Sequence, residues 1–323
     1  MRKRGLLIAV LVVLIAALAF LLYMYVGLIR RPQIVTGPGG VRMRHLFSIH
    51  GYGNNPSQLL SKPYDVATDK KGNIYISDTG NSRVLVFDDS GDFLFKFGTK
   101  GKKRGQFETP LGIAVGADGR IYVADRILNK VLIFNSKGKF IKEFKVMMPL
   151  VLAVANSKVY IATYGPIIIY DLEGNELAKW GRRGQKKGEF DFPGGIAVDK
   201  KGSVYLSDTN NLRLQALDKN GEVLWVLGSP AKDIMAKERR FGLPAGVALD
   251  EDRRIYLVDA FHFSLRILNR HGKEISELGG EPGQEEGQFY QAAGIAYLGK
   301  GTIAVADQFN NRVQVLEVTI PNK

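Results

Sequence analysis

Short stretches in which apolar and polar residues alternate recur along most of this 323-residue chain. Alternation with a period of two is typical of β-strands that bury one face. In the first clear copy of the pattern, such stretches cover residues 65–69, 74–77, 84–88 and 93–97, with polar or glycine-containing turns between them. Each copy of the pattern therefore predicts a sheet of four short strands.

The copies share one sequence template. It runs Gly-Ile-Ala-Val-Asp, a turn ending in Gly, Ile-Tyr-Ile-Ser-Asp, a polar loop, Arg-Val-x-Val-Phe, a second Gly turn and a last alternating stretch. Copies begin near residues 63, 110, 149, 193, 244 and 292, a spacing in the range of propeller blades. Sheets packed radially around an axis bury both faces and leave only short edges. An all-β propeller is therefore expected.

The last copy, residues 294–318, contains three strands instead of four. An unassigned strand-like segment, residues 45–51, matches the fourth-strand pattern of residues 93–98. We expect this early segment to complete the last blade and close the ring. The propeller should then span residues 42–318 with six blades, followed by a short tail over residues 319–323.

The motif Pro-Gly-Gly-Ile-Ala-Val-Asp at 193–199, followed by Val-Tyr-Leu-Ser-Asp-Thr-Asn-Asn-Leu-Arg at 204–213, resembles the NHL repeat. The connector Gly-x-x-Gly-x-x-x-Gly-x-Phe at 181–190 resembles it as well. The resemblance covers residues 41–318 and implies a six-bladed propeller of the membrane-anchored bacterial extracytoplasmic type. Two copies depart from the pattern: the third reads Thr-Tyr-Gly-Pro at 163–166, and the fifth has His262 and Ser264 where others have Asn and Arg.

The amino terminus carries an uncharged apolar run over residues 6–29. As a helix this run would be roughly 36 Å long, enough to cross an apolar bilayer core of about 30 Å. Basic residues in the tail 1–5 favour a cytoplasmic amino terminus. We expect a signal-anchor helix, a tether over residues 30–41 and a propeller outside the cytoplasm, on the cell membrane. The alternative is a signal peptide cleaved near Ala17-Leu18-Ala19.

The basic residues of the chain are clustered, and this clustering indicates where a ligand could bind. Five of the 45 basic residues and none of the 32 acidic ones lie in residues 1–31, so the remainder keeps an excess of +8. Loops between second and third strands and connectors between blades should open on one face. On that face we expect ligand-binding cations from three connectors: Lys100, Lys102, Lys103, Arg104, Arg182, Arg183, Lys186, Lys187, Arg239 and Arg240. The next connector is acidic, with Glu281, Glu285 and Glu286.

Apolar residues stand in the same loops although the turns do not require them. We expect these to form a contact patch or to cap the central channel: Ile127, Tyr164, Phe261, Phe263 and Phe309. A binding or scaffold module for a protein, a peptide or an anionic envelope polymer is the favoured function.

Catalysis is the alternative. Propellers resembling this one include lyases with histidine-bound zinc and metal-dependent hydrolases, but the four histidines, His45, His50, His262 and His271, are spread over the sequence. The chain has no cysteine, which excludes disulfides and thiolate chemistry. We expect no catalytic residue, cofactor or metal site. Nucleic-acid binding, known for some NHL propellers, is disfavoured by the predicted anchor.

A repeated aspartate ends the second strand of five copies, at positions 78, 125, 208, 259 and 307. Four of these are followed five residues later by a basic residue: Arg83, Lys130, Arg213 and Arg312. An ion pair that holds each turn explains this spacing better than a carboxylate ring around the axis. We therefore expect a structural role.

Overall fold

A computed structural model describes residues 15–21, 34–229 and 240–321 of the chain. The chain divides into two compact units, Met1–Gln33 and Ile34–Lys323. In the first unit residues 15–21 are helical. No helix in the described part of the chain has the length and apolar character that a membrane span requires. The remainder of the predicted anchor, residues 6–14 and 22–29, lies outside the described residues.

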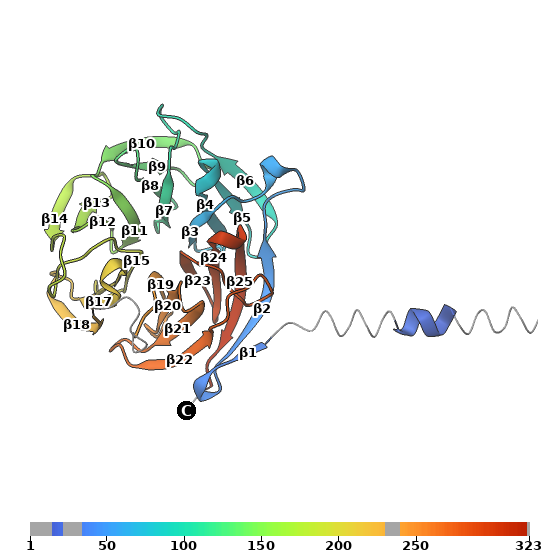
Figure 1. Cartoon of the computed structure of the whole chain (residues 1–323). Helices are drawn as coiled ribbons and strands as arrows, with labels where there is room; N and C mark the ends of the chain where they lie inside the picture. Colours follow the sequence, from blue (N-terminus) through green and yellow to red (C-terminus); the bar gives the residue numbers. More distant parts are fainter. Residues whose placement is uncertain (1–14, 22–33, 230–239, 322–323) are drawn as a thin grey trace, which may run out of the picture. The chain divides into compact units, whose positions relative to one another are not determined.

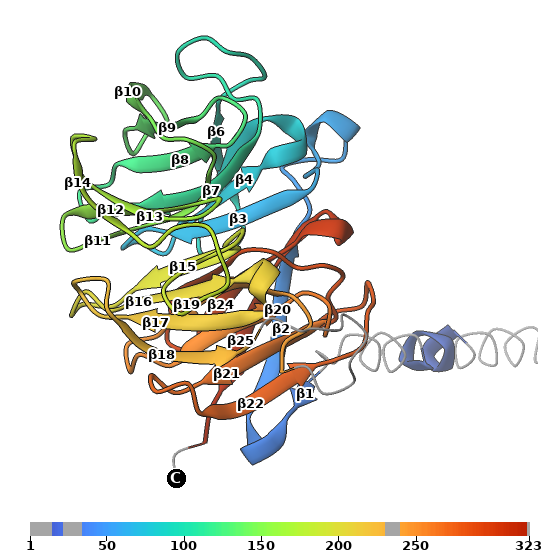
Figure 2. The same ribbon diagram turned by 60° about the vertical axis from the view of Figure 1, so that its left-hand side comes forward.

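The second unit contains six antiparallel sheets arranged around a common axis, which confirms the predicted propeller (Figure 1). Figure 2 shows the same sheets from another side. The first three blades are β3 (Pro63–Thr68), β4 (Ile74–Asp78), β5 (Arg83–Phe87), β6 (Phe93–Phe97); β7 (Pro110–Val115), β8 (Ile121–Asp125), β9 (Lys130–Phe134), β10 (Phe140–Lys145); β11 (Pro149–Ala155), β12 (Lys158–Thr163), β13 (Ile167–Asp171) and β14 (Glu176–Trp180).

The other three blades follow the same order, and the sixth is built from both ends of the unit. Their strands are β15 (Gly195–Val198), β16 (Val204–Asp208), β17 (Arg213–Leu217), β18 (Val223–Gly228); β19 (Pro244–Leu249), β20 (Ile255–Asp259), β21 (Ser264–Leu268), β22 (Glu274–Gly279); and β23 (Ile295–Gly299), β24 (Thr302–Asp307), β25 (Arg312–Thr319), β2 (Arg42–Ile49), β1 (Ile34–Thr36). The described residues also form five short 3-10 helices: η1 (Pro38–Gly40), η2 (Pro56–Gln58), η3 (Thr79–Asn81), η4 (Thr209–Asn211) and η5 (Gln308–Asn310).

Apolar side chains pack between neighbouring blades. Between the first and second blades, Tyr75 and Phe97 pack with Phe107, Ile121 and Phe134 in one buried cluster. The rings of Phe97 and Phe134 lie 4.6 Å apart, centre to centre. The second and third strands of most blades are buried on both faces, as radial packing requires.

The innermost strands approach one another closely at the axis, where four blades have a glycine at the same position of the template. A Cβ on Gly195 would lie 2.5 Å from the carbonyl oxygen of Ala245 on the next blade. The amide of Gly294 donates to the carbonyl oxygen of Tyr64, 2.8 Å away, so backbone hydrogen bonds join adjacent blades here. Glycine is needed at positions 195 and 294 because an added Cβ would collide with backbone atoms of the next blade.

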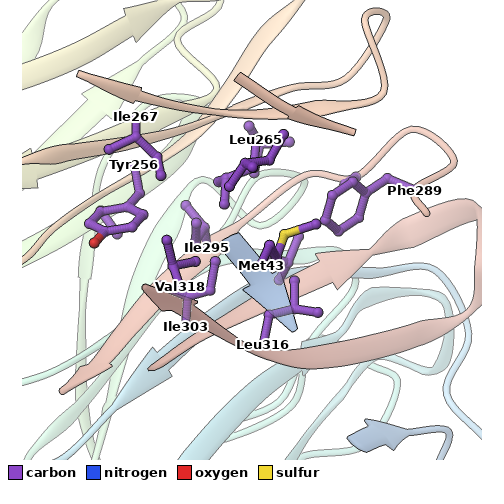
Figure 3. Close-up of a cluster of buried hydrophobic side chains, with 14 of the residues drawn as sticks. Met43, Tyr256, Leu265, Ile267, Phe289, Ile295, Ile303, Leu316 and Val318 are labelled. Atoms are coloured by element: carbon purple, nitrogen blue, oxygen red, sulfur yellow. The ribbon is translucent and has the colours of Figure 1, made fainter. Parts of the chain in front are cut away.

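The ring closes as predicted from residues 45–51. Strand β2 pairs antiparallel with β25 and places Met43 opposite Val318 and Phe47 opposite Val315. Figure 3 shows Met43 among Phe289, Leu316 and Val318, in a buried cluster shared by the fifth and sixth blades. The strand begins three residues earlier than expected because this apolar pocket continues to Met43.

The described part of the expected tether is structured. Residues 34–36 form β1, which pairs with β2 in register from Ile34 opposite Arg44 to Thr36 opposite Arg42. Val41 is buried, and Val35 packs against the same core cluster. Prediction of a tether over residues 30–41 is therefore wrong for residues 34–41. An additional strand covers the outer edge of the sixth blade, whose backbone groups would otherwise lack partners.

Candidate functional site

The connectors and the loops between second and third strands lie on the same side of the propeller, which we call the loop face. Arg83, at the start of β5, donates to the carbonyl oxygens of Ser57 and Leu59 in the preceding connector, at 2.7 and 2.8 Å. Arg213 does the same with Gln185 and Lys186. These contacts confirm that both kinds of loop open together.

Three of the repeated aspartates form the expected structural ion pairs. The Arg Nε to Asp Oδ2 distance is 2.6 Å for Arg83 and Asp78, 2.7 Å for Arg213 and Asp208, and 2.8 Å for Arg312 and Asp307. The three carboxylates are fully buried. An Asn three residues after each Asp donates to the same carboxylate, at Asn81, Asn211 and Asn310. None of these three aspartates is exposed to a ligand on the loop face.

In the second blade the expected pair between Asp125 and Lys130 does not form. Lys130 instead lies 2.7 Å from Glu143 on the neighbouring strand. Asp125 accepts backbone N–H groups of Glu108 and Thr109, at 2.8 and 3.0 Å. A lysine has one compact charge on a flexible stem, so it does not reproduce the arginine's contacts with the connector.

The fifth blade departs from the repeat and presents a histidine. His262 occupies the position of the capping Asn, and its Nδ1 lies 3.0 Å from Oδ2 of the buried Asp259. Hydrogen bonding to this carboxylate raises the pKa of His262. Arg266, seven residues after Asp259, supplies the guanidinium that position 264 lacks, at 3.5 Å. In the described part of the chain, Nε2 of His262 has no hydrogen-bond partner, and the side chain is 38% exposed.

The basic connectors are partly neutralised. Lys100, Lys102, Lys103 and Arg104 are exposed and form no ion pair among the described residues. By contrast, Arg182 pairs with Glu189 at 2.9 Å, and Arg183 pairs with Asp191 at 3.1 Å. Other candidate cations stand as follows: Lys186 and Lys187 are exposed, Arg240 lies 3.8 Å from Glu274, and Arg239 falls outside the described residues. The loop face therefore has fewer unpaired cations among the described residues than the sequence predicted.

Most of the predicted apolar loop residues do reach the surface. Ile127, Phe261 and Phe309 are 53%, 49% and 47% exposed. Phe263 and Tyr164 are half-buried, and the guanidinium of Arg183 lies over the Tyr164 ring at 4.7 Å. These residues come from four different blades, so the structure brings them to one face but not into one cluster.

Tyr290, absent from our sequence prediction, connects two of them. Its ring lies nearly parallel to that of Phe263 at 6.3 Å and edge-on to Phe309 at 6.0 Å, and it is 44% exposed. Phe263, Tyr290 and Phe309 form what we call the aromatic row. Position 290 directly follows the buried Phe289 of the connector motif, and an extra aromatic residue there was the available signal.

The axis holds a second residue that sequence reasoning missed. Asp65 lines a narrow cavity of about 60 Å³ between the innermost strands. Its carboxylate accepts the amides of Val66 and Ile113, at 2.9 and 3.1 Å. Burial raises the pKa of Asp65 to about 7. The sequence signal was an aspartate at the template position where four other blades have glycine.

The histidines do not meet. His45 lies on β2 near Ser48 and Glu286, whereas His271 sits in the turn between β21 and β22. Across residues 34–229 and 240–321, no three His, Asp or Glu side chains are placed to hold a metal ion together.

Comparison with known families agrees with this architecture. A family model described as a 6-bladed beta-propeller matches residues 55–158, and the NHL repeat model matches residues 190–224. This chain is an NHL-type six-bladed β-propeller. The NHL match covers the fourth blade, whose Asp208, Asn211 and Arg213 form the structural cap described above.

Two curated proteins share sequence similarity with this NHL propeller. Protein brain tumor of Drosophila melanogaster is 27% identical over 173 residues, which is 52% of this chain and 12% of that protein. NHL repeat-containing protein 2 of Gallus gallus is 34% identical over 82 residues, 24% of this chain and 11% of that protein. The matched regions thus span about a tenth of these relatives.

Solved structures share the fold at low identity. A protein of unknown function from Bacteroides thetaiotaomicron is 16% identical with a TM-score of 0.66, covering 86% of this chain and 76% of that one. A gluconolactonase from Xanthomonas campestris is 14% identical with a TM-score of 0.60, covering 89% and 95%. A catalytically inactive virginiamycin B lyase from Staphylococcus aureus, with quinupristin, is 13% identical with a TM-score of 0.58, covering 89% and 94%.

Proposed function

We propose that this NHL propeller is a binding or scaffold module whose loop face binds a protein, a peptide or an anionic polymer. One observation carries the proposal: exposed lysines and exposed aromatic rings occupy the same face although the blades need neither. The structural cations, such as Arg213, are buried in the caps. Those at positions 100–104 and 186–187 remain available to an anionic partner.

The aromatic row supplies the apolar part of this surface. Tyrosine and phenylalanine rings bury large areas at interfaces with little loss of side-chain entropy. Tyr290 and Phe309 of the row are each close to half exposed, as is Phe261 beside the row's loop, and Ile127 and Met147 add apolar surface at the second and third blades. A partner with both acidic groups and apolar side chains therefore matches the loop face best.

We also propose that residues 6–29 anchor the propeller on the outer side of a cell membrane. Support comes from the sequence: a 24-residue uncharged run with basic residues on its cytoplasmic flank. Protease added to intact cells should cleave the propeller, and alkaline carbonate should leave the protein in the membrane fraction. Protection from protease in intact cells would contradict an external location.

The binding proposal can be tested with the released domain, residues 34–321. The domain is immobilised and exposed to solubilised envelope fractions at low and high salt. Reversal of Lys102, Lys103, Arg183 and Lys187 to Glu should abolish retention of the anionic partner, because the attraction depends on these charges. Reversal of Lys70, Lys71, Lys137 and Lys139 on the opposite face is the control. Equal retention by both variants would exclude an anionic partner on the loop face.

A lyase or hydrolase is the second candidate, and one observation favours it. Asp259 holds Nδ1 of His262, which leaves Nε2 directed away from the buried carboxylate, as in a general base. Replacement of His262 by Asn restores the residue found in other blades. Loss of partner turnover with retained binding would support catalysis; unchanged turnover would assign His262 to the cap. Metal analysis of the purified domain tests the metal-dependent version.

A further inference from the structure

An open pocket of about 410 Å³ lies on the face opposite the loops, where the turns of the fourth and fifth blades meet the sixth. Its apolar floor consists of Val198, Leu249 and Tyr297, near the ends of the innermost strands β15, β19 and β23. Pockets of several hundred Å³ with an apolar floor and a few polar groups are typical of small-molecule sites.

The polar wall of this pocket contains three basic and three acidic side chains. Lys200, Lys201 and Arg253 line it from two adjacent turns, and both lysines are exposed. Two of the acidic residues that line the pocket already accept backbone hydrogen bonds. The buried Asp199 accepts the amides of Lys201 and Ser203 at 2.8 and 2.9 Å, and the buried Asp250 accepts the amide of Arg254 at 2.8 Å.

Glu251 is the remaining acidic residue that lines the pocket. The Tyr297 hydroxyl, which also lines the pocket, lowers the pKa of the Glu251 carboxyl. Lys200 and Lys201 have no ion-pair partner among the described residues, whereas Arg253 lies 3.5 Å from the buried Asp199. The unoccupied groups of the pocket favour a ligand with negative charge.

Arg253 holds a backbone conformation that the first, second and fourth blades assign to glycine. Its φ is +61°, whereas the corresponding turns of the first and fourth blades have Gly72 at +87° and Gly202 at +86°. The left-handed region is unfavourable for residues with a Cβ. Here an arginine is retained, and its Nη1 reaches across to 3.5 Å from Asp199 of the neighbouring blade. Strained residues of this kind concentrate at ligand sites.

We propose that this pocket binds a small organic anion, a carboxylate or phosphate carried on an apolar body of about one ring. The anionic group would contact Arg253 and the two lysines, and the apolar body would cover Val198, Leu249 and Tyr297. This site is separate from the loop face and does not depend on the function proposed above.

A comparable pocket between the first and second blades provides a matched control. It has a volume of about 420 Å³ and is lined by Lys70 and Lys71, which correspond to Lys200 and Lys201. Its second turn carries Gly119 at the position of Arg253. The control pocket lacks the guanidinium that we assign to ligand binding, and its third cation is Lys137, from the turn between β9 and β10.

Titration calorimetry with the released domain tests the proposal, with phenyl phosphate, inorganic phosphate and benzyl alcohol as probes. Phenyl phosphate should bind saturably, about ten-fold more tightly than inorganic phosphate, and benzyl alcohol should not bind. Replacement of Arg253 by Gly should weaken phenyl phosphate binding about ten-fold. The same change should leave the melting temperature unchanged or raise it, because the backbone strain is removed.

The K70S/K71S variant should bind phenyl phosphate as the wild type does, and K200S/K201S should bind it weakly. The loop-face charge reversals should leave this binding unchanged, which distinguishes failure of one proposal from failure of the other. Absence of saturable phenyl phosphate binding at millimolar concentration, or equal affinity in the R253G variant, would overturn the proposal.

Discussion

The Nε atom of Arg213 lies 2.7 Å from Oδ2 of Asp208, and the two side chains are 5% and 0% exposed. Removal of one partner from a buried pair leaves an uncompensated charge and typically costs about 3–5 kcal/mol. We expect R213M to destabilise the domain by this amount in urea unfolding. The control is R182A, whose pair with Glu189 is at the surface and should be worth about 1 kcal/mol or less. Equal effects of the two substitutions would contradict a structural role for Arg213.

Met43 is fully buried where β2 joins the last blade. Truncation of a buried methionine to alanine costs about 2–5 kcal/mol, because it removes apolar contacts and leaves a cavity. M43A should lower the free energy of unfolding by this amount, and R44A, at an exposed neighbouring position, should change it little. A negligible effect of M43A, measured by chemical denaturation, would mean that β2 does not close the ring.

Gly195 faces the next blade at the axis. An added Cβ would lie 2.5 Å from the carbonyl oxygen of Ala245 and 2.6 Å from the amide nitrogen of Val247, and both are backbone atoms. We expect G195A to destabilise the domain by about 1–3 kcal/mol through overpacking. In G116A the added Cβ meets the end of the Asp118 side chain, which can move. That control should therefore lose less stability; a similar loss in both would argue against close packing at the axis.

Asp65 should make stability depend on pH. Burial raises the pKa of its carboxyl from the ordinary value of 3.8 to about 7, so the folded state holds this proton more tightly than the unfolded state. The contribution of Asp65 to the free energy of unfolding is fully present below pH 3.8 and is lost as the pH rises to about 7. The free energy of unfolding changes by up to about 4 kcal/mol over this range. Relative to wild type, D65N should therefore become more stable between pH 4 and pH 8. Parallel pH profiles in urea unfolding would contradict this.

Much of the propeller follows from local sequence pattern. The alternation of apolar and polar residues predicts the strands. The fixed spacing between the Asp that ends the second strand and the Gly of the next turn predicts the register within each blade. The match of residues 45–51 to 93–98 gives the closing strand without any contact information. These features are repeated, so each copy supports the interpretation of the others.

What could not be predicted depends on contacts between blades. Lys130 follows Asp125 at the same spacing as Arg213 follows Asp208, yet it pairs with Glu143. Sequence spacing cannot show that Glu143 lies closer in space. Likewise, Arg182 and Arg183 counted as free cations until the structure placed Glu189 and Asp191 beside them. Asp65 and Arg253 depart from the template, and reasoning from the repeat overlooks residues that only one copy carries.

The sheet that closes the ring joins residues 273 positions apart, as in the hydrogen bond between Arg44 and Glu317. During synthesis β2 emerges early, and the edge that pairs with β25 has no partner until β25 leaves the ribosome. Contacts of such long sequence separation slow folding, and an unpaired edge strand can meanwhile pair with another chain. Nascent chains are therefore most exposed to aggregation in the interval between translation of β2 and translation of β25. The first five blades, whose strands are consecutive in the sequence, have less need of a chaperone than the sixth.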